Sequence, residues 1–320
     1  MKNGQMIFKT FSSVLLALLL VYSCRSRNSK PVDLIESTAD SLPTSFAEPS
    51  VPLYLIVVPR EIRIKEYFRF IDSLVLAFDT LTPYPLTEHL LVRANPWIID
   101  NLENTDYYRQ KIQGTIVYDQ RQLPVLHAGD SLFIPDEQKA DDLLDRISRT
   151  QIDINIPEFS LKVLERGDVV HCISVRVGQN LKRHQQATGR LEDLRTKPGT
   201  GKIVNINREP TVFSDPHTGK RFTHTKRDDG EITRMPLIPW IEPEINGVRL
   251  GQLLHPTTNK ETIGKAYSNG CIGFTEGEAW RLYYYAPIGT RLTIRYDLIL
   301  VNAPGDTVLL PDVYGWGNKK

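Results

Sequence analysis

The hydrophobic period of this chain changes near residue 150, and this change constrains the fold strongly. Between residues 62 and 78 apolar side chains recur at spacings of three and four, which predicts an amphipathic helix. Beyond residue 150 apolar and polar residues alternate, as around Leu161, which predicts strands. The chain has 320 residues, of which 41% are hydrophobic, so it can bury a sizeable core. We therefore predict an α+β N-terminal domain (51–149), a mainly-β domain (150–301) and a C-terminal tail (302–320).

The N-terminal domain is predicted to start with a strand at residues 53–58, ahead of the helix just described. A second helical stretch is expected at residues 86–102, where Pro96 must break or restart the helix. A charged helix over residues 137–149 should close the domain. Residues 126–135 predict a Gly-Asp turn and a short strand, and they resemble the closing strand of a LysM-type glycan-binding module. A plain α+β packing domain is the alternative.

The second domain should open with a hairpin whose turn lies at residues 165–168. Val169, Ile173, Val175 and Val177 are expected on one alternating face of its second strand. Short strands separated by Gly and Pro favour a β-sandwich or a barrel-like domain. Further strands are predicted at residues 202–206, 247–253 and 291–296.

The first 24 residues have the features of a secretory signal. Two lysines precede an apolar run over residues 14–22, which is too short to span a bilayer, and Cys24 follows closely. The segment ending at Cys24 resembles a bacterial lipobox, in which the cysteine is lipidated and becomes the new N-terminus. An ordinary cleaved signal and an uncleaved anchor are the alternatives, and all three place the remaining chain outside the cytoplasm. Residues 25–50 are polar and should tether the folded part, which predicts a periplasmic or cell-envelope location.

Charge and cysteine content argue against several classes of function. The formal net charge is +1 at pH 7, which gives no overall attraction toward nucleic acid. The three cysteines have neither zinc spacing nor the pattern of a disulfide framework, and Cys172 is interpreted as a structural thiol in a strand. Asp215, His217 and His224 lack the tight repeat of a zinc site and are expected in a solvated loop. The sequence therefore predicts neither a metal nor a cofactor.

The segment from His255 to Phe274 carries residues suited to acyl transfer. Thiolate is the reactive form of cysteine, and an unperturbed thiol, with a pKa of about 8.5, is mostly protonated at neutral pH. An imidazole can take that proton, so Cys271 is predicted as the nucleophile and His255 as its base. Backbone N–H groups can stabilise the oxyanion that forms, and Gly270, without a Cβ, lets backbone and substrate approach closely. A buried structural thiol is the alternative for Cys271.

Two loops are predicted to shape this site. Ser268 can hydrogen-bond within its own loop and fix its conformation. Thr275 and Glu278 form a T-x-x-E capping box ahead of a helix over residues 276–285, so the nucleophile lies just before a capped helix. Residues 213–239 are polar and then Pro-rich, with few strand signals, which predicts an irregular flap over the substrate.

These residues resemble the active-site signature of the L,D-transpeptidases, the YkuD family. The signature consists of His255, Gly264 and the run Ser268-Asn269-Gly270-Cys271. Three flanking segments follow in the family's order: a Thr-Pro-x-Gly-like strand start (195–203), a Met-Pro ahead of the substrate flap (235–236) and a closing strand (289–294). The resemblance covers roughly residues 150–297, most of a catalytic domain.

The resemblance implies a β-sandwich enzyme that cleaves an L,D-peptide bond in the peptidoglycan stem. Such enzymes hold the stem as a thioester and pass it to an amine on a neighbouring stem or on a protein. By this resemblance His255 is base and acid, the carbonyl of Pro256 orients it, and the N–H groups of Gly270 and Cys271 bind the oxyanion. The implied partners are stem peptides, and the lipobox-like segment adds a membrane, reached through a lipid on Cys24. The other implied site residues are Ser268 and Asn269 in the catalytic loop, and Met235 and Trp240 in the cleft.

Two positions depart from the family's pattern. Pro256 replaces the glycine that usually follows the histidine; it keeps the carbonyl but stiffens the loop. Gly273 replaces the arginine that usually organises the site, and Arg249, Arg281 or Arg295 is the candidate substitute. Three functions stay open: an L,D-transpeptidase, an L,D-carboxypeptidase in which water replaces the amine, and a glycan-binding lipoprotein with a degenerate catalytic domain.

Overall fold

The computed structural model of the chain describes residues 52–186, 189–215, 218–301 and 305–317. All of them belong to one compact unit, Phe46–Lys320. The predicted signal, Cys24, the tether and His217 lie outside the described residues. None of the described helices combines the length and the apolar character that a membrane span requires.

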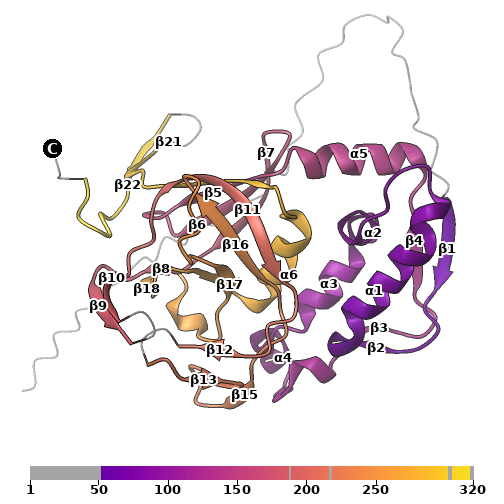
Figure 1. Cartoon of the computed structure of the whole chain (residues 1–320), viewed down its shortest axis with the longest axis horizontal. Coiled ribbons are helices and arrows are strands. Elements are labelled where there is room, and N and C mark those ends of the chain that lie inside the picture. Colours follow the sequence, from indigo (N-terminus) through magenta and orange to yellow (C-terminus); the bar gives the residue numbers. More distant parts are fainter. Residues whose placement is uncertain (1–51, 187–188, 216–217, 302–304, 318–320) are drawn as a thin grey trace, which may run out of the picture. The chain divides into compact units, whose positions relative to one another are not determined.

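Helices dominate the described chain up to residue 148 (Figure 1). Two antiparallel pairs, β1–β4 and β2–β3, join its beginning to its end. The strand, helices and turn predicted here are confirmed, and Pro96 occupies the N-cap of α3, where its missing N–H removes no helical hydrogen bond. The elements are β1 (Tyr54–Val57), β2 (Ile62–Arg63), α1 (Ile64–Phe78), α2 (Glu88–Ala94), α3 (Trp97–Asn104), α4 (Tyr107–Ile112), β3 (Pro124–Leu126), β4 (Ser131–Ile134) and α5 (Glu137–Ser148).

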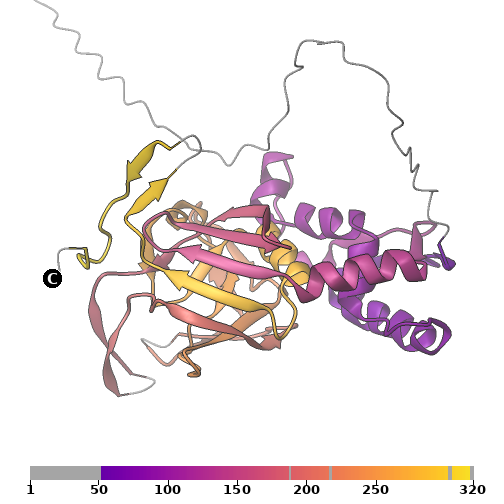
Figure 2. The ribbon, with the colours of Figure 1, turned by 90° about the horizontal axis from the view of Figure 1, so that it is seen from above.

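Strands dominate from residue 151 onward. The elements are β5 (Gln151–Asn155), β6 (Ser160–Glu165), β7 (Asp168–Ser174), β8 (Val177–Gly178), β9 (Lys182–Gln185), β10 (Arg190–Asp193), β11 (Gly199–Asn207), β12 (Phe213–Ser214), β13 (Arg221–Phe222), β14 (His224–Lys226), β15 (Ile232–Arg234), β16 (Trp240–Ile245), β17 (Leu254–Pro256), β18 (Ala266–Ser268), β19 (Ile272–Phe274), α6 (Glu276–Tyr285), β20 (Arg291–Arg295), β21 (Ile299–Val301) and β22 (Thr307–Leu309). Eight strands form one sheet in the order β19–β17–β16–β11–β20–β5–β6–β7 (Figure 2). The pairs β17–β19 and β20–β5 are parallel, and the others are antiparallel. The predicted order, an α+β part followed by a mainly-β domain, is confirmed.

The β6–β7 hairpin turns where the sequence predicts it. Gly167 takes a φ of 94°, which glycine adopts without strain. Ile173, Val175 and Val177 are buried, as expected. The expectation is wrong for Val169, which is 52% exposed, because a bulge in the β6–β7 pairing shifts the register and reverses the alternation.

The strand predicted at residues 247–253 is also wrong, because this segment is the connection between β16 and β17. Asn246 and Gly247 turn the chain with φ values of 51° and 77°, and Gly251 at 69° interrupts an extended run. The preceding strand, β16, is not predicted because Pro243 lies inside it. The strand tolerates this proline because the β11–β16 register is irregular at that point.

One hydrophobic core joins the helical part to the sheet, and α6 lies within it. Trp280 and Tyr283 of α6 are buried and contact aromatic rings of α1. The ring centroids of Trp280 and Tyr67 are 6.1 Å apart, and those of Tyr283 and Phe68 are 5.8 Å apart. The hydroxyls of Tyr67 and Tyr284 are 2.6 Å apart. Buried residues from both predicted domains form a continuous cluster. The sequence boundary near residue 149 is therefore not a break in the core.

Part of the predicted C-terminal tail is folded against the β domain. β21 and β22 form an antiparallel hairpin. Beyond it Tyr314 is 4% exposed and stacks on Tyr296 at 5.5 Å. The Tyr314 hydroxyl donates to the carbonyl of Gly178 at 2.7 Å and accepts from the N–H of Thr196 at 3.1 Å. This segment therefore contacts β8 at Gly178 and the loop before β11 at Thr196.

Candidate active site

Two neighbouring strands place the predicted nucleophile and base. β17 and β19 pair in parallel, with His255 opposite Gly273. The N–H of Ile272 donates to the carbonyl of Leu253 at 2.9 Å, so Cys271 lies just before its strand and opposite Leu253. Because side chains alternate along a strand, those of His255 and Cys271 leave the sheet on the same face.

Both side chains line one cleft of about 1080 Å³. This volume is in the range of sites that bind extended or drug-sized ligands. The structure therefore brings together every described residue that the sequence predicts for the site. These are Met235, Trp240, His255, Pro256, Ser268, Asn269, Gly270 and Cys271.

The ring of His255 has a defined orientation. Its Nδ1 lies 2.8 Å from the carbonyl oxygen of Pro256. A carbonyl oxygen can only accept, so Nδ1 carries the hydrogen and Nε2 keeps a lone pair. The Trp240 ring packs beside it at 5.6 Å. Burial lowers the pKa of His255 to about 4, the charge of Arg176 lowers it too, and the bond to Pro256 opposes both. The imidazole is therefore neutral at pH 7 and can accept a proton.

The thiol of Cys271 is also uncharged at rest. Burial raises its pKa, while a backbone hydrogen bond from Leu253 and the charge of Arg176 oppose that rise. Its Sγ lies 3.8 Å from the carbonyl oxygen of Gly251. A neutral thiol and a neutral imidazole in one cleft require that the proton move as the nucleophile attacks.

The catalytic loop is fixed by its own hydrogen bonds. Gly270 takes a φ of +105°, which explains a residue without a side chain at this position. The Ser268 hydroxyl donates to the carbonyl of Cys271 and accepts the Gly270 N–H at 3.2 Å. The Gly270 N–H, expected to bind the oxyanion, is thus already engaged. After the loop, the predicted capping box of Thr275 and Glu278 is confirmed at the start of α6.

Sequence reasoning missed the support beneath this loop. The hydroxyl of Thr196 donates to the carbonyl of Gly270 at 3.0 Å and accepts the N–H of Gly178 at 2.9 Å. Tyr314 in turn contacts both Thr196 and Gly178, as described above. Since these residues are far apart in sequence, no local pattern could have predicted the contact.

The predicted flap forms two short hairpins and not an irregular segment. β12 pairs with β13, and β14 pairs with β15. Strands of two or three residues are too short to give a periodic signal. The rings of Phe213 and Phe222 line the cleft, and Phe213 lies 6.2 Å from Trp240. The flap thus contributes apolar surface beside the predicted base.

Helix α4 holds the turn of the second hairpin. The Tyr107 hydroxyl donates to Asp229 at 2.8 Å. The Tyr108 hydroxyl contacts the carboxylate of Asp228 and lies 2.9 Å from the carbonyl of Thr258, three positions after His255. The acidic turn of the flap therefore binds the helical part of the chain.

A buried ion pair lies behind the flap. Arg227 Nη1 and Glu276 Oε1 are 2.6 Å apart, and both side chains are fully buried. Glu276 also accepts from the Gln120 side chain at 2.6 Å and from the Tyr107 N–H at 2.9 Å. Burial raises the pKa of Glu276, and the charge of Arg227 opposes that rise. One carboxylate thus joins the flap, the helical part and the start of α6.

Residues 149–294 match the family model of the L,D-transpeptidase catalytic domain, YkuD. Over these residues the chain is similar to the YkuD family. An L,D-transpeptidase from Mycobacterium smegmatis is 15% identical at a TM-score of 0.33, over 46% of this chain and 58% of its own. An L,D-transpeptidase from Xylanimonas cellulosilytica DSM 15894 is 16% identical at a TM-score of 0.33, over 78% of this chain and 100% of its own. No curated protein sequence matches the chain.

The YkuD-like domain of this chain carries its cleft arginine at a position that the sequence did not indicate. Of the three candidates, Arg249 lines the cleft, but it is paired with Glu242. Arg281 and Arg295 pair with carboxylates outside the cleft. Arg176, between β7 and β8, lines the cleft beside Cys271. The sequence marks Arg176 only weakly, as a single charged residue between Val175 and Val177.

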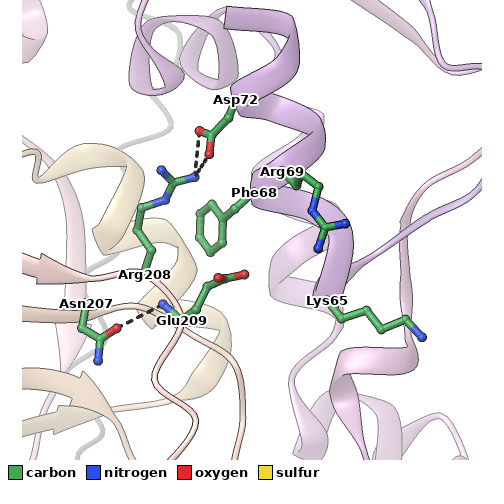
Figure 3. A pocket seen from close by; sticks show the side chains of 7 residues that line it. All are labelled: Lys65, Phe68, Arg69, Asp72, Asn207, Arg208 and Glu209. Carbon is green, nitrogen blue, oxygen red and sulfur yellow. Dashed lines mark hydrogen bonds and ion pairs between the residues drawn. The ribbon is translucent and has the colours of Figure 1, made fainter. Parts of the chain in front are cut away.

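A second hollow, of about 400 Å³, lies between α1 and the end of β11 (Figure 3). Arg208 donates to both oxygens of Asp72 at 2.9 Å and lies 4.4 Å above the ring of Phe68. No predicted site residue lines this hollow, so we interpret it as a contact between the helical part and the YkuD-like domain. The described residues include no group of three or more His, Cys, Asp and Glu that could hold a metal.

Proposed function

We propose that this chain is an L,D-transpeptidase that acts on peptidoglycan stem peptides through a thioester on Cys271. One observation carries the proposal: the pairing of β17 with β19 directs His255 and Cys271 into the same cleft. The match of residues 149–294 to the YkuD family model supports the class of substrate. The cleft that both residues line has a volume of about 1080 Å³, in the range of sites that bind ligands of this class.

In the first half-reaction, the thiol proton of Cys271 moves to Nε2 of His255 while Sγ attacks the carbonyl carbon of the L,D-peptide bond. The carbonyl oxygen becomes an oxyanion, and the N–H of Cys271 is the candidate donor, because that of Gly270 is engaged by Ser268. The C–N bond then breaks, and the imidazolium of His255 gives its proton to the leaving amine. The stem remains bound as a thioester.

In the second half-reaction, an acceptor amine attacks the thioester carbon and loses a proton to His255. The carbon–sulfur bond breaks, and the leaving thiolate takes that proton back, which restores the enzyme. If water replaces the amine, the same steps trim the stem and the chain is an L,D-carboxypeptidase. The geometry of His255 and Cys271 serves either acceptor.

The test is incubation of the protein with tetrapeptide muropeptides, followed by mass spectrometry of the products. We expect direct cross-links between two diamino acids, absent with Cys271→Ala. Trimmed stems without cross-links would favour the carboxypeptidase. No product of either kind, with sacculus binding that survives Cys271→Ala, would favour a glycan-binding lipoprotein with a degenerate catalytic domain.

We also propose that the protein is exported and anchored to a membrane by a lipid on Cys24. The support is the sequence pattern of a basic start, a short apolar run and the lipobox-like segment. Metabolic labelling with a fatty-acid analogue should mark the unchanged protein and not Cys24→Ala. Labelling that persists in Cys24→Ala, or an unlabelled soluble protein, would contradict the anchor.

A further inference from the structure

Arg176 is bound by its backbone to the strand that follows the nucleophile. Its N–H donates to the carbonyl of Gly273 at 2.7 Å, and its carbonyl accepts the Gly273 N–H at 3.1 Å. Gly273 thus lies between Arg176 on one side and His255 on the other. Residues directly opposite one another in a sheet point to the same face. Arg176, His255 and Cys271 therefore share one face, with a side-chain-free position between them.

The side chain of Arg176 occupies the space that a side chain at position 273 would need. A Cβ built on Gly273 would lie 2.6 Å from Arg176 Nε, 3.0 Å from its Cγ and 3.2 Å from its Cδ. Contacts this short are not tolerated without displacement of the arginine. Glycine at position 273 is thus a steric requirement of Arg176.

The charge of Arg176 is not neutralised by a carboxylate in the described part of the chain. Its Nη1 donates to Thr262 at 3.2 Å, and its Nε has no hydrogen-bond partner among the described residues. The groups that act on its charge are Cys271 and Tyr267. An arginine stays protonated even when it is partly buried, so this positive charge is permanent.

We propose that Arg176 is the positioning residue that stabilises the thiolate of Cys271, and that its side chain, from the segment between β7 and β8, occupies the space that Gly273 leaves open. This inference rests on the proposed function, because only a nucleophilic Cys271 needs such a charge. A cation on the same face as the thiol favours the thiolate and disfavours the imidazolium. Arg176 therefore promotes return of the proton from His255 to the leaving amine as well as the attack.

Several other charged groups that line the cleft are already paired. Asp193 binds both Arg195 and Lys197, and Arg249 binds Glu242. This distinguishes Arg176 from the other arginines of the cleft. Besides Cys271, the titratable and charged groups that line the cleft are His255 from β17, Arg176, Glu192, Asp193, Arg195 and Lys197 from β10 and the loop after it, His224 and Lys226 from β14, and Arg249. Tyr267 of β18 acts on the charge of Arg176.

The test is the pH dependence of Cys271 alkylation by iodoacetamide, followed by mass spectrometry of the Cys271 peptide in the full chain. Arg176→Gln should raise the midpoint of the curve of alkylation rate against pH by about one pH unit. Alkylation at pH 8 then becomes about tenfold slower. Arg176→Lys should keep the midpoint of the unchanged protein, because it keeps the charge. Arg291→Gln is the matched control and should not move the midpoint, because Arg291 is exposed on β20 and does not line the cleft.

Exchanging the residues at positions 176 and 273 tests the claim that Arg176 occupies the space beside Gly273. Gly273→Ala alone should slow alkylation, because its Cβ displaces Arg176 and brings no charge of its own. Arg176→Gly combined with Gly273→Arg should return the rate at pH 8 to within about threefold of the unchanged protein. An Arg176→Gln titration that superposes on the unchanged one, or a swap no better than either single change, would overturn the proposal. Alkylation needs no peptide substrate, so this result is independent of whether cross-linking is found.

Discussion

His255 is held so that one ring nitrogen remains available as a base. The bond from Nδ1 to Pro256 leaves Nε2 free to take the proton of Cys271. His255→Gln keeps much of the side-chain volume but removes the base, so kcat/KM for stem peptides should fall by about 10²- to 10⁴-fold. Steady-state kinetics on the muropeptide substrate measure this loss. A loss below about threefold, with unchanged thermal melting, would exclude the assigned role.

The two pKa directions predict the pH behaviour of the pair. Burial holds the pKa of Cys271 above its ordinary value and that of His255 at about 4. The thiolate fraction increases as pH rises toward the raised thiol pKa, so alkylation by iodoacetamide should still accelerate above pH 8.5. On the acid side, turnover should persist until His255 is protonated, at about pH 4 to 5. A plateau in alkylation below pH 7 would instead reveal a preformed imidazolium–thiolate pair.

Individual residues differ in how far the sequence predicts them. Cys271, His255 and Gly270 are predictable because short spacings in one segment carry their signal. Arg176 lies far upstream, and only the β19 pairing brings it to the site. The Gly273 departure indicated that an arginine was needed, but the three arginines named from the sequence pair elsewhere. A cross-strand contact of this kind has no signature in a single sequence.

At the scale of elements, the link between α4 and the flap is the least expected feature. Tyr108 contacts Asp228 in the flap turn and Thr258 just past the predicted base. Tyr108→Phe removes this hydroxyl, so the flap should be held less firmly and KM for the stem peptide should rise about fivefold. Substrate titrations measure the change.

Tyr118→Phe provides the matched control, because the Tyr118 side chain is 55% exposed. Tyr118→Phe should leave KM within about twofold of that of the unchanged protein. If Tyr108→Phe lowers the melting temperature but leaves KM unchanged, the contact stabilises the fold without positioning the flap.

Elements with a clear apolar or capping pattern are predicted correctly, and several short elements without one are not. The helix α1 and the hairpin β6–β7 follow from apolar spacing, and α6 follows from its capping box. β16 was not predicted because a proline interrupts its pattern, and the flap hairpins are too brief to show any. These shorter elements form the walls of the cleft, so the sequence located the chemistry better than the binding surface.

At the scale of the whole molecule, Glu276 ties three parts of the chain together. Removing its charge leaves Arg227 buried without a counter-ion, so Glu276→Gln should lower the free energy of unfolding by about 3–5 kcal/mol. Urea denaturation measures this. Glu244→Gln breaks a more exposed pair with Lys202 and should cost no more than about 1 kcal/mol. Equal losses from the two changes would contradict the linking role of Glu276.

The continuous core gives the helical part a role that the sequence did not reveal. Residues before the predicted boundary supply Tyr67 and Phe68 to the core around α6, and Tyr107 and Tyr108 to the flap. Whether this part also binds glycan, as its LysM-like segment suggests, stays a prediction. Its packing against α6 and the flap accounts for its presence in either case.

The most direct measurement is the intact mass of the protein quenched during reaction with a tetrapeptide stem. The account predicts a covalent adduct equal to the stem without its terminal D-amino acid, released by hydroxylamine, mapped to Cys271 and absent in Cys271→Ala. Product formation without such an adduct, or an adduct on any other residue, would contradict it.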